Sequence, residues 1–264
     1  MLAAVMPIKN EEKRLKRTIE TLLSIPIELI IAVINGSKDD SYNIVQHSLT
    51  EKILPLYFTE TLGFDIPRAI GAKAALERGA TTVLFIDGDM DGNISEHIRE
   101  LADMINRGDA DMALTDCYPG GNRNGLSQLA NHVLKARYQL NQAIGLEQNL
   151  GIASPSHGPH AVSRRLLLSI PMREIAIPPV SLALAAKGGL KVHVGTRAPH
   201  KELGSPHKNN RHAQLIAETI IGDCMEAINV YHGQARHRAC GQVEYDGYHS
   251  QRRWDLLDNY LSGK

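Results

Sequence analysis

The sequence predicts an α/β protein in which a mostly parallel central sheet is flanked by helices. Segments typical of strands and helices alternate through the first 115 residues, and this order predicts parallel strands joined by right-handed crossovers. The run Val83-Leu84-Phe85-Ile86 is apolar at every position, which indicates a strand covered on both faces. A chain of 264 residues is long enough for one large domain with a substantial core.

The strands of the first half are predicted from short runs rich in β-branched and aliphatic residues. We expect them at residues 2–6, 29–34, 53–58, 82–86 and 110–115. Pro55 cannot donate a hydrogen bond to a neighbouring strand, so the third of these strands is expected at an edge of the sheet.

The helices between these strands are predicted from apolar residues that recur every three or four positions. The apolar faces consist of Leu15, Ile19, Leu22 and Leu23 within residues 11–24, and of Ile94, Ile98, Leu101 and Ile105 in the helix that follows Asn93. Residues 65–78 are rich in alanine and are also expected to be helical. The segments at residues 37–40 and 93–96 match the capping-box pattern, so each is expected to open a helix.

The second half of the chain differs in character, and we divide the sequence into residues 1–116, 117–231 and 232–264. Loops rich in Gly, Pro and polar residues are expected at residues 119–125 and 154–160, and helices at residues 126–144 and 211–231. The last part is rich in Arg and His but carries Tyr245, Tyr248, Trp254 and Tyr260. These aromatic residues indicate that it packs against the core or against a second copy of the chain, so a homodimer through this extension is one expectation.

Composition excludes several partners. Lys and Arg total 29 and so do Asp and Glu, so net charge gives no support for a nucleic-acid or membrane-surface partner. No apolar run is long enough to span a bilayer, and the N-terminus lacks the features of a signal peptide. Cys117, Cys224 and Cys240 show no paired or metal-type spacing. We therefore expect free thiols and a cytoplasmic protein.

The most informative motif is Asp87-Gly88-Asp89, which directly follows the apolar run. Open α/β sheets bind ligands beyond the carboxyl ends of their strands. Two carboxylates at that edge suit Mn²⁺ or Mg²⁺, with substrate phosphates as further ligands. The competing interpretation is an ordinary Asp/Gly turn at Asp87.

Three other segments precede this motif in a characteristic order: residues 5–12 (VMPIKNEE), 33–39 (VINGSKD) and 65–73 (DIPRAIGAK). The ordered set resembles the family 2 glycosyltransferases, which have the GT-A fold and a D-x-D motif. The resemblance implies a metal-dependent transferase that uses a nucleoside-diphosphate sugar, either a UDP-sugar or a GDP-sugar. It makes residues 1–116 the nucleotide-sugar-binding half of the domain and residues 117–231 the acceptor-binding half.

The resemblance also implies roles for individual residues of the donor site. Those at the first two strand ends are Pro7, Ile8, Glu11, Asn35, Gly36 and Ser37, and those nearer the acidic motif are Arg68, Asp87 and Gly88. Pro7 and Glu11 would border the base and ribose, Arg68 would pair with the diphosphate, and Asp89 with Asp87 would hold the metal that neutralises the leaving group. The competing interpretations are a helix cap for Ser37 and a surface ion pair for Arg68. The family usually has two acids where this chain has Ile34-Asn35.

The second half resembles a narrower group, the glucosyl-3-phosphoglycerate synthases, which are retaining GT-A enzymes. The likeness rests on Gly120-Gly121-Asn122-Arg123, on residues 157–171 and on residues 194–204. It implies that Gly121, Arg123 and His157 contact a small polar acceptor and that His200 is a third metal ligand. His157, His160 and His207 are rivals for the ligand role, and a solvent-exposed loop is the competing interpretation of His200. The synthases carry an acid in the segment that corresponds to residues 178–181, and this chain has none there.

The reaction class depends on a general base. Inverting family members use an Asp from a Glu-Asp pair, and no such pair follows residue 115. Asp116 and Glu174 are the remaining catalytic candidates beside Asp89. Since a retaining enzyme of this fold needs no such base, retention is favoured. The alternatives are a nucleotidyltransferase, whose Gly-rich basic loop the first strand end lacks, and an inactive nucleotide-sugar-binding protein.

Overall fold

The computed structural model describes residues 1–121, 125–204 and 209–263 and is built on a seven-stranded sheet with the strand order β3-β2-β1-β4-β6-β5-β7. The strands are β1 (Leu2–Ile8), β2 (Leu29–Asn35), β3 (Ile53–Phe58), β4 (Thr82–Phe85), β5 (Met112–Asp116), β6 (His160–Ser163) and β7 (Val192–Arg197). β6 is antiparallel to β4 and β5, and the other pairs are parallel. The predicted mostly parallel sheet is therefore confirmed, and β3, which contains Pro55, lies at its edge.

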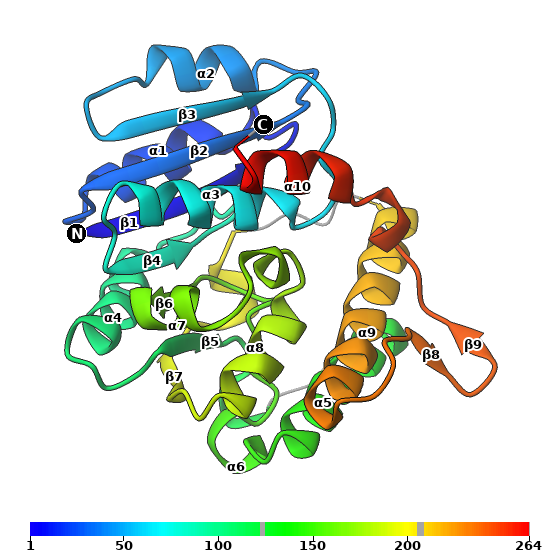
Figure 1. Ribbon diagram of the computed structural model, residues 1–264. Coiled ribbons are helices and arrows are strands. Elements are labelled where there is room, and N and C mark those ends of the chain that lie inside the picture. The colour runs from blue at the N-terminus through cyan, green and yellow to red at the C-terminus, as the bar shows by residue number, and fades with distance from the viewer. Residues whose placement is uncertain (122–124, 205–208, 264) are drawn as a thin grey trace.

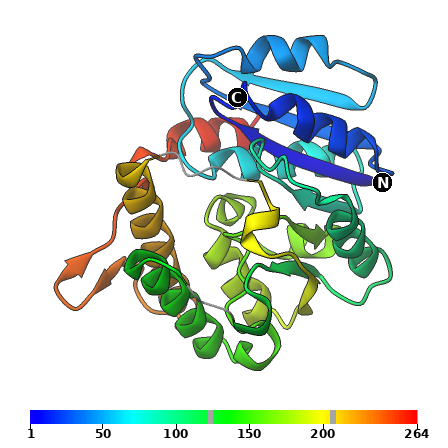
Figure 2. The ribbon, with the colours of Figure 1, turned by 180° about the vertical axis from the view of Figure 1, so that it is seen from behind.

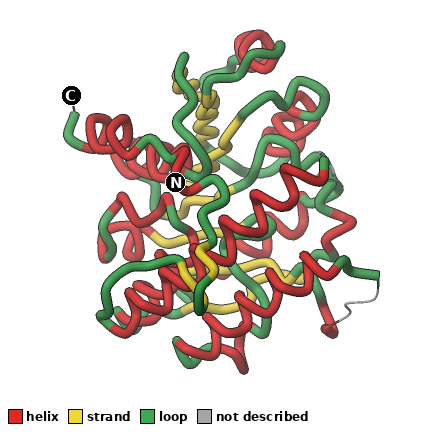
Figure 3. Tube along the Cα trace, turned by 90° about the vertical axis from the view of Figure 1, so that its right-hand side faces the viewer, coloured by secondary structure: helices red, strands yellow, loops and turns green. Residues whose placement is uncertain are grey.

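Helices cover both faces of this sheet. They are α1 (Leu15–Leu23), α2 (Ser41–His47), α3 (Ile66–Glu77), α4 (Ser95–Asn106), α5 (Gln128–Ala143), α6 (Glu147–Leu150), α7 (Arg164–Ser169), α8 (Pro178–Lys187), α9 (Asn210–His232) and α10 (Trp254–Leu261). Figure 3 shows the strands running between helices on either side. Alternate residues of β1 divide between two core clusters, because side chains along a strand point to opposite faces: Ala3 and Val5 pack with α3, and Ala4 and Met6 pack with α1 and α4.

Both predicted capping boxes are wrong, although both helices form. α2 begins at Ser41 with Asp40 as its N-cap, and α4 begins at Ser95 with Ile94 as its N-cap; neither N-cap side chain makes a capping hydrogen bond. The Ser37 hydroxyl is used elsewhere: it accepts a hydrogen bond from the Asn10 N–H at 3.1 Å and lies 3.4 Å from the Ile8 carbonyl. Contacts to the loop after β1 therefore take the place of the predicted cap.

α3 lies unusually close to β1. A Cβ atom added at Gly71 would lie 2.3 Å from Cγ1 of Val5, a distance at which one of the two elements would have to move. The absence of a side chain at this position lets α3 approach the sheet, so its N-terminus lies near the strand ends.

The second half adds helices across one end of the sheet. α9 packs against both α5 and α8, and Figure 1 shows it standing beyond the carboxyl ends of β1, β2 and β3. The remaining elements are the short 3₁₀ helices η1 (Pro119–Gly121), η2 (Met172–Ala176), η3 (His200–Glu202) and η4 (His249–Gln251). None of the helices in the described ranges is long and apolar enough to cross a membrane.

The C-terminal extension returns to the body of its own chain. A hairpin of β8 (Ala239–Cys240) and β9 (Val243–Glu244) projects outward, as both Figure 1 and Figure 2 show. Residues 245–253, here called the strap, then cross toward α3, and α10 packs on α3. Contacts within one chain thus account for the aromatic residues, and the homodimer stays a prediction.

Candidate active site

A cavity of about 790 Å³ opens where β1, β2 and β4 end. α5 and α9 form its far wall. Ten of the residues predicted for the site line it: Pro7, Ile8, Glu11, Asn35, Arg68, Asp87, Gly88, Asp89, His157 and His200. The structure therefore brings together most of the residues predicted for the donor site in the first half and two of the histidines singled out in the second half.

Asn35 shapes the wall of this cavity at the end of β2. Its Nδ2 donates to the Gly63 carbonyl at 3.1 Å, and its Oδ1 accepts from the Leu62 N–H at 2.6 Å. The side chain is buried. Asn35 thus holds the loop before α3 in place, a task that an amide with both a donor and an acceptor performs.

Gly36 and Ser37 lie behind the wall and do not line the cavity. Gly36 has φ +57°, and a Cβ atom there would lie 2.7 Å from the Thr61 N. Glycine is required by both the backbone conformation and the close approach. These two residues set the paths of the loops that line the cavity.

Arg68 is the buried centre of a chain of ion pairs. Its Nη2 lies 2.5 Å from Oδ1 of Asp87, and its Nε lies 2.8 Å from Oδ1 of Asp65. Burial opposes its charge, but Asp87 and then Asp65 raise its pKa overall. The surface-ion-pair interpretation is wrong, because only 7% of Arg68 is exposed. Its Nη1 is buried without a hydrogen-bond partner, so one donor at the cavity wall is unsatisfied.

Asp87, Asp89 and His200 line one cavity, but their ligand atoms do not form a compact triad. Among the described residues, the one group of three such side chains within 4.8 Å of one another is Asp223, Glu226 and His249. In that group Asp223 pairs with Arg252 and Arg238, and Glu226 pairs with Arg238 and Arg236. Arginines already neutralise both carboxylates there, so that cluster is an anchor for the extension.

Two histidines and a buried arginine form a hydrogen-bonded row on the acceptor side. Nη1 of Arg137 lies 3.1 Å from Nδ1 of His157, and Nε2 of His157 lies 2.9 Å from Nδ1 of His200. Burial, followed by the charge of Arg137, lowers the pKa of both histidines. Both are therefore neutral near pH 7. Tyr118 packs against both rings.

The direction of this row determines the tautomers. An arginine only donates, so Nδ1 of His157 must accept, and its proton lies on Nε2. That Nε2–H then donates to Nδ1 of His200, which leaves the His200 proton on Nε2. For His200 to bind a metal through Nε2, its proton must move to Nδ1, so the hydrogen bond between the two histidines must first break.

Arg137 has no carboxylate partner among the described residues. It is 4% exposed, its Nη2 donates to the Ser156 carbonyl at 3.3 Å, and its Nε is buried without a partner. Burial lowers its pKa, and the groups that oppose this are the Cys224 and Cys117 thiols and the Tyr118 hydroxyl. A buried cation balanced only by weak acids is costly, and this one lines the cavity.

Other predicted residues lie away from the cavity or outside the described ranges. The Asp116 carboxylate accepts a hydrogen bond from the Tyr118 N–H at 2.9 Å, as in a turn. Glu174 forms an ion pair with Arg236 at 2.8 Å and, like Asp116 and Gly121, does not line the cavity. His160 is buried in β6 and stacked on Phe85. Arg123 and His207 lie outside the described residues.

Sequence reasoning missed Arg137 and the strap. Arg137 follows Val133 by four positions and precedes Leu140 by three, so helical spacing places it on the apolar face of α5. That spacing was the available signal. Tyr248 and Gln251 of the strap also line the cavity, and no local pattern in the sequence indicates this.

Comparison with known proteins gives one family match. The model of a family described as glycosyl transferase family 2 matches residues 3–168. No curated protein matches the chain in sequence.

Several solved structures share the fold. Glucosyl-3-phosphoglycerate synthase from Mycobacterium tuberculosis, in complex with Mn²⁺ and uridine-diphosphate-glucose, has a TM-score of 0.62 and 18% identity over 89% of this chain and 80% of that chain. The same enzyme in complex with phosphoglyceric acid has a TM-score of 0.61 and 17% identity, over 89% and 81% of the two chains. Its complex with Mg²⁺ and uridine-diphosphate has a TM-score of 0.52 and 17% identity, over 85% and 79%.

Proposed function

The chain belongs to glycosyl transferase family 2, and from this membership we propose that it transfers a sugar from a nucleoside-diphosphate sugar to a small anionic acceptor with the help of a divalent metal ion. Its fold is the GT-A fold of its structural neighbours. The observation that carries the proposal is the shared cavity. The acidic motif after β4, the ends of β1 and β2, and the row formed by Arg137, His157 and His200 all open into it.

The proposed binding of the sugar donor beside Asp87 and Asp89 is supported by the kinds of metal ligand found there. Two carboxylates and a neutral imidazole form a donor set that suits Mn²⁺ or Mg²⁺, and neighbouring structures contain these ions with uridine-diphosphate. Asp89 is the principal metal ligand in this proposal because it is the second acid of the D-x-D motif that the family resemblance identifies, and Asp87 is the first. A bound metal ion supplies charge neutralisation for the leaving diphosphate.

Arg68 adds a second contact for the diphosphate. Its Nη2 and Nε are held by Asp87 and Asp65, which fixes the plane of the guanidinium, and its buried Nη1 remains unsatisfied. A phosphate oxygen of the donor would satisfy that N–H. The family resemblance and this unsatisfied donor agree on the same role.

The acceptor end is supported by Arg137. A carboxylate or phosphate group on the acceptor would balance its buried charge, and a neighbouring structure holds phosphoglyceric acid. We expect Arg137→Met to raise the KM for anionic acceptors at least tenfold while leaving donor affinity unchanged. The assay is transfer to a panel of phosphorylated and carboxylated small molecules, phosphoglyceric acid among them. Equal KM values in both proteins would contradict the assignment.

Retention of configuration is supported by the identity of the acids in the cavity. The carboxylates that line it within the described residues are Glu11, Asp65, Asp87 and Asp89, all contributed by the first half of the chain. The histidines on the acceptor side have lowered pKa values, which weakens them as bases. The departing phosphate would then accept the proton of the acceptor hydroxyl. NMR of the product tests this, and an inverted anomeric carbon would contradict it.

Nucleotide binding tests the proposal as a whole. A thermal-shift panel of UDP, GDP, ADP, CDP and dTDP, each with and without Mn²⁺, should show stabilisation by one nucleotide that requires the metal, because a ligand of the native state raises stability by mass action. Asp89→Ala should remove this stabilisation and leave the ligand-free melting temperature near that of the wild type. Absence of any shift in the wild type would contradict the proposal. Hydrolysis of the sugar donor with Mn²⁺ would distinguish an enzyme from a protein that only binds the nucleotide.

A further inference from the structure

The strap forms the part of the cavity wall that lies beside the end of β2. Tyr248 and Gln251 line the cavity together with Asn35, Gly63 and Phe64. The strap lies outside residues 3–168, the part of the chain that matches the family model. The cavity is therefore completed by a segment that the family match does not include.

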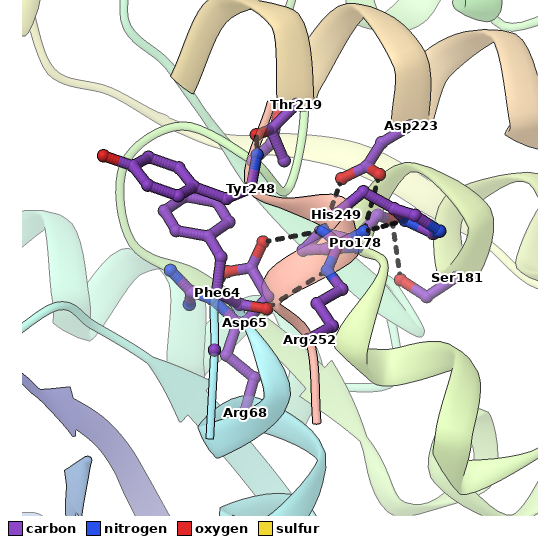
Figure 4. Close-up of polar contacts among 12 residues, drawn as sticks. Phe64, Asp65, Arg68, Pro178, Ser181, Thr219, Asp223, Tyr248, His249 and Arg252 are labelled. Carbon is purple, nitrogen blue, oxygen red and sulfur yellow. Dashed lines mark hydrogen bonds and ion pairs between the residues drawn. The ribbon is translucent and has the colours of Figure 1, made fainter. Parts of the chain in front are cut away.

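Arg252 fastens the strap to both halves of the domain (Figure 4). It is 3% exposed, and its Nη1 and Nη2 donate to the two carboxylate oxygens of Asp223 on α9 at 2.8 and 2.7 Å. Its Nε donates to the Phe64 carbonyl at 3.1 Å, and its Nη2 lies 3.7 Å from Asp65. A two-point pair between guanidinium and carboxylate fixes orientation as well as distance.

The contacts on either side of Arg252 leave the strap little freedom. The Arg253 N–H donates to the Leu62 carbonyl at 2.8 Å, and the Tyr248 N–H donates to Oγ1 of Thr219 at 2.7 Å. The Tyr248 ring stacks on Phe64, with ring centroids 5.7 Å apart and planes inclined by 18°. A Cβ atom at Gly63 would lie 2.3 Å from the Gln251 carbonyl oxygen. These contacts fix the positions of Tyr248 and Gln251 at the cavity wall.

Their position along the sheet indicates which part of the donor they face. The acidic motif follows β4, and β1 separates β4 from β2 in the sheet. Two strand spacings of about 4.8 Å make roughly 10 Å between the two strand ends. In the proposed function the diphosphate binds at Asp87 and Asp89. A nucleoside that extends from it along the strand ends, past Pro7 and Glu11, would reach the end of β2 and the strap.

We infer that Tyr248 and Gln251 contact the nucleoside of the sugar donor and help determine which base is accepted, an inference that rests on the proposed function. The Gln251 amide offers both a donor and an acceptor, as the edge of a nucleobase requires. The Tyr248 ring packs on Phe64 and lines the cavity, and aromatic surface at that wall would add affinity for any base. Gln251 determines the choice between bases, and Tyr248 adds affinity for all of them.

The test compares nucleoside diphosphates with pyrophosphate, which carries the same phosphates without a nucleoside. Calorimetry in Mn²⁺ is carried out with UDP, GDP, ADP, CDP and pyrophosphate on the wild type and on Gln251→Ala, Gln251→Glu and Tyr248→Leu. The matched control is Ser250→Ala, since Ser250 is exposed and its hydroxyl donates to Asp246 within the same turn of the strap.

For Gln251→Ala we expect about tenfold weaker binding of the preferred nucleotide, the equivalent of one polar contact, with unchanged pyrophosphate affinity. Gln251→Glu, which can only accept at that position when ionised, should alter the order of preference among the bases. Tyr248→Leu should weaken all nucleotides alike. Gln251 is exposed, so its variants test the inference even if Tyr248→Leu does not fold.

Two results would overturn the inference alone: nucleotide affinities that do not change in the Gln251 variants, or an equal loss of pyrophosphate affinity in them. A wild-type protein that binds pyrophosphate but no nucleotide better than pyrophosphate would also overturn it. A wild type that binds none of these ligands would overturn the proposed function together with the inference, so the two failures are distinguishable.

Discussion

Two adjacent arginines of the strap should differ sharply in what they contribute to stability. Arg252 is buried and pairs with Asp223, which is 1% exposed. Arg253 pairs with Glu60 and Asp255 at the surface. Removal of one partner costs about 3–5 kcal/mol when it leaves a buried charge unpaired. Asp223 would keep its pair with Arg238, so the loss of Arg252 belongs at the lower end of that range. Exposed pairs contribute little.

We therefore expect Arg252→Ala to lower the free energy of unfolding by about 3 kcal/mol. For a chain of this size each kcal/mol corresponds to about 2–4 °C, so the melting temperature should fall by roughly 6–12 °C. Arg253→Ala should melt close to the wild type, because its surface pairs are solvated and its backbone bond to Leu62 is retained.

Urea unfolding followed by two probes measures both effects. Far-UV circular dichroism reports the whole fold, while fluorescence of Trp254, the only tryptophan in the chain, reports the start of α10 directly after the strap. Coincident transitions would show that the strap unfolds with the domain, and an earlier fluorescence transition would show that it detaches first. Equal stabilities of Arg252→Ala and Arg253→Ala would refute the reasoning, because the buried pair would then contribute no more than the exposed one.

Three further outcomes are expected. Gly71→Ala should lower stability by about 1–3 kcal/mol in urea unfolding, because the added methyl group would collide with Val5; a stabilised variant would show that α3 is free to shift. Burial, followed by nearby arginines, lowers the pKa of His249 to about 4, whereas the pKa of a histidine in the unfolded chain is about 6.5. Between these two pH values the unfolded state binds a proton that the native state does not bind. Stability should therefore fall as the pH drops from 6.5 to 4, and His249→Gln should flatten the dependence of melting temperature on pH across that window. His200→Ala should weaken Mn²⁺ binding about tenfold or more, and identical Mn²⁺ titrations would move the ligand role to another residue.

The sheet could be predicted because its strands are local signals. β1, β2 and β4 are short apolar runs that end in polar or glycine residues, and Pro55 marks the edge strand through a property of one residue. The capping boxes failed because capping is a competition for hydrogen bonds. The Ser37 hydroxyl bonds to Asn10 in the loop after β1, 27 residues away in sequence. A pattern of four consecutive residues contains no information about that competing partner.

The difference between local signals and contacts over long sequence separations also decides which residues of the candidate site could be predicted. Asp87 and Asp89 follow an apolar strand, so sequence places them at the sheet edge, and the structure has them there. Glu174 is held away from the cavity by its ion pair with Arg236, which lies 62 residues later in the chain. A contact over that separation depends on the tertiary fold, so no local sequence pattern predicts it. The burial of Arg137 could have been predicted, because it lies at helical spacing from two apolar residues, four positions after Val133 and three before Leu140.

The strap also affects the order in which the domain can be completed during synthesis. The bond from Arg252 to the Phe64 carbonyl joins residues 188 positions apart. At about 5–20 residues per second, roughly 10–40 s pass between the emergence of its two ends from the ribosome. During that interval Asp65 and the Phe64 carbonyl lack their last partner and remain open to water. The wall of the cavity beside β2 thus forms only after residue 252 has been made, and a donor molecule cannot be fully enclosed by a nascent chain that has not yet reached the strap.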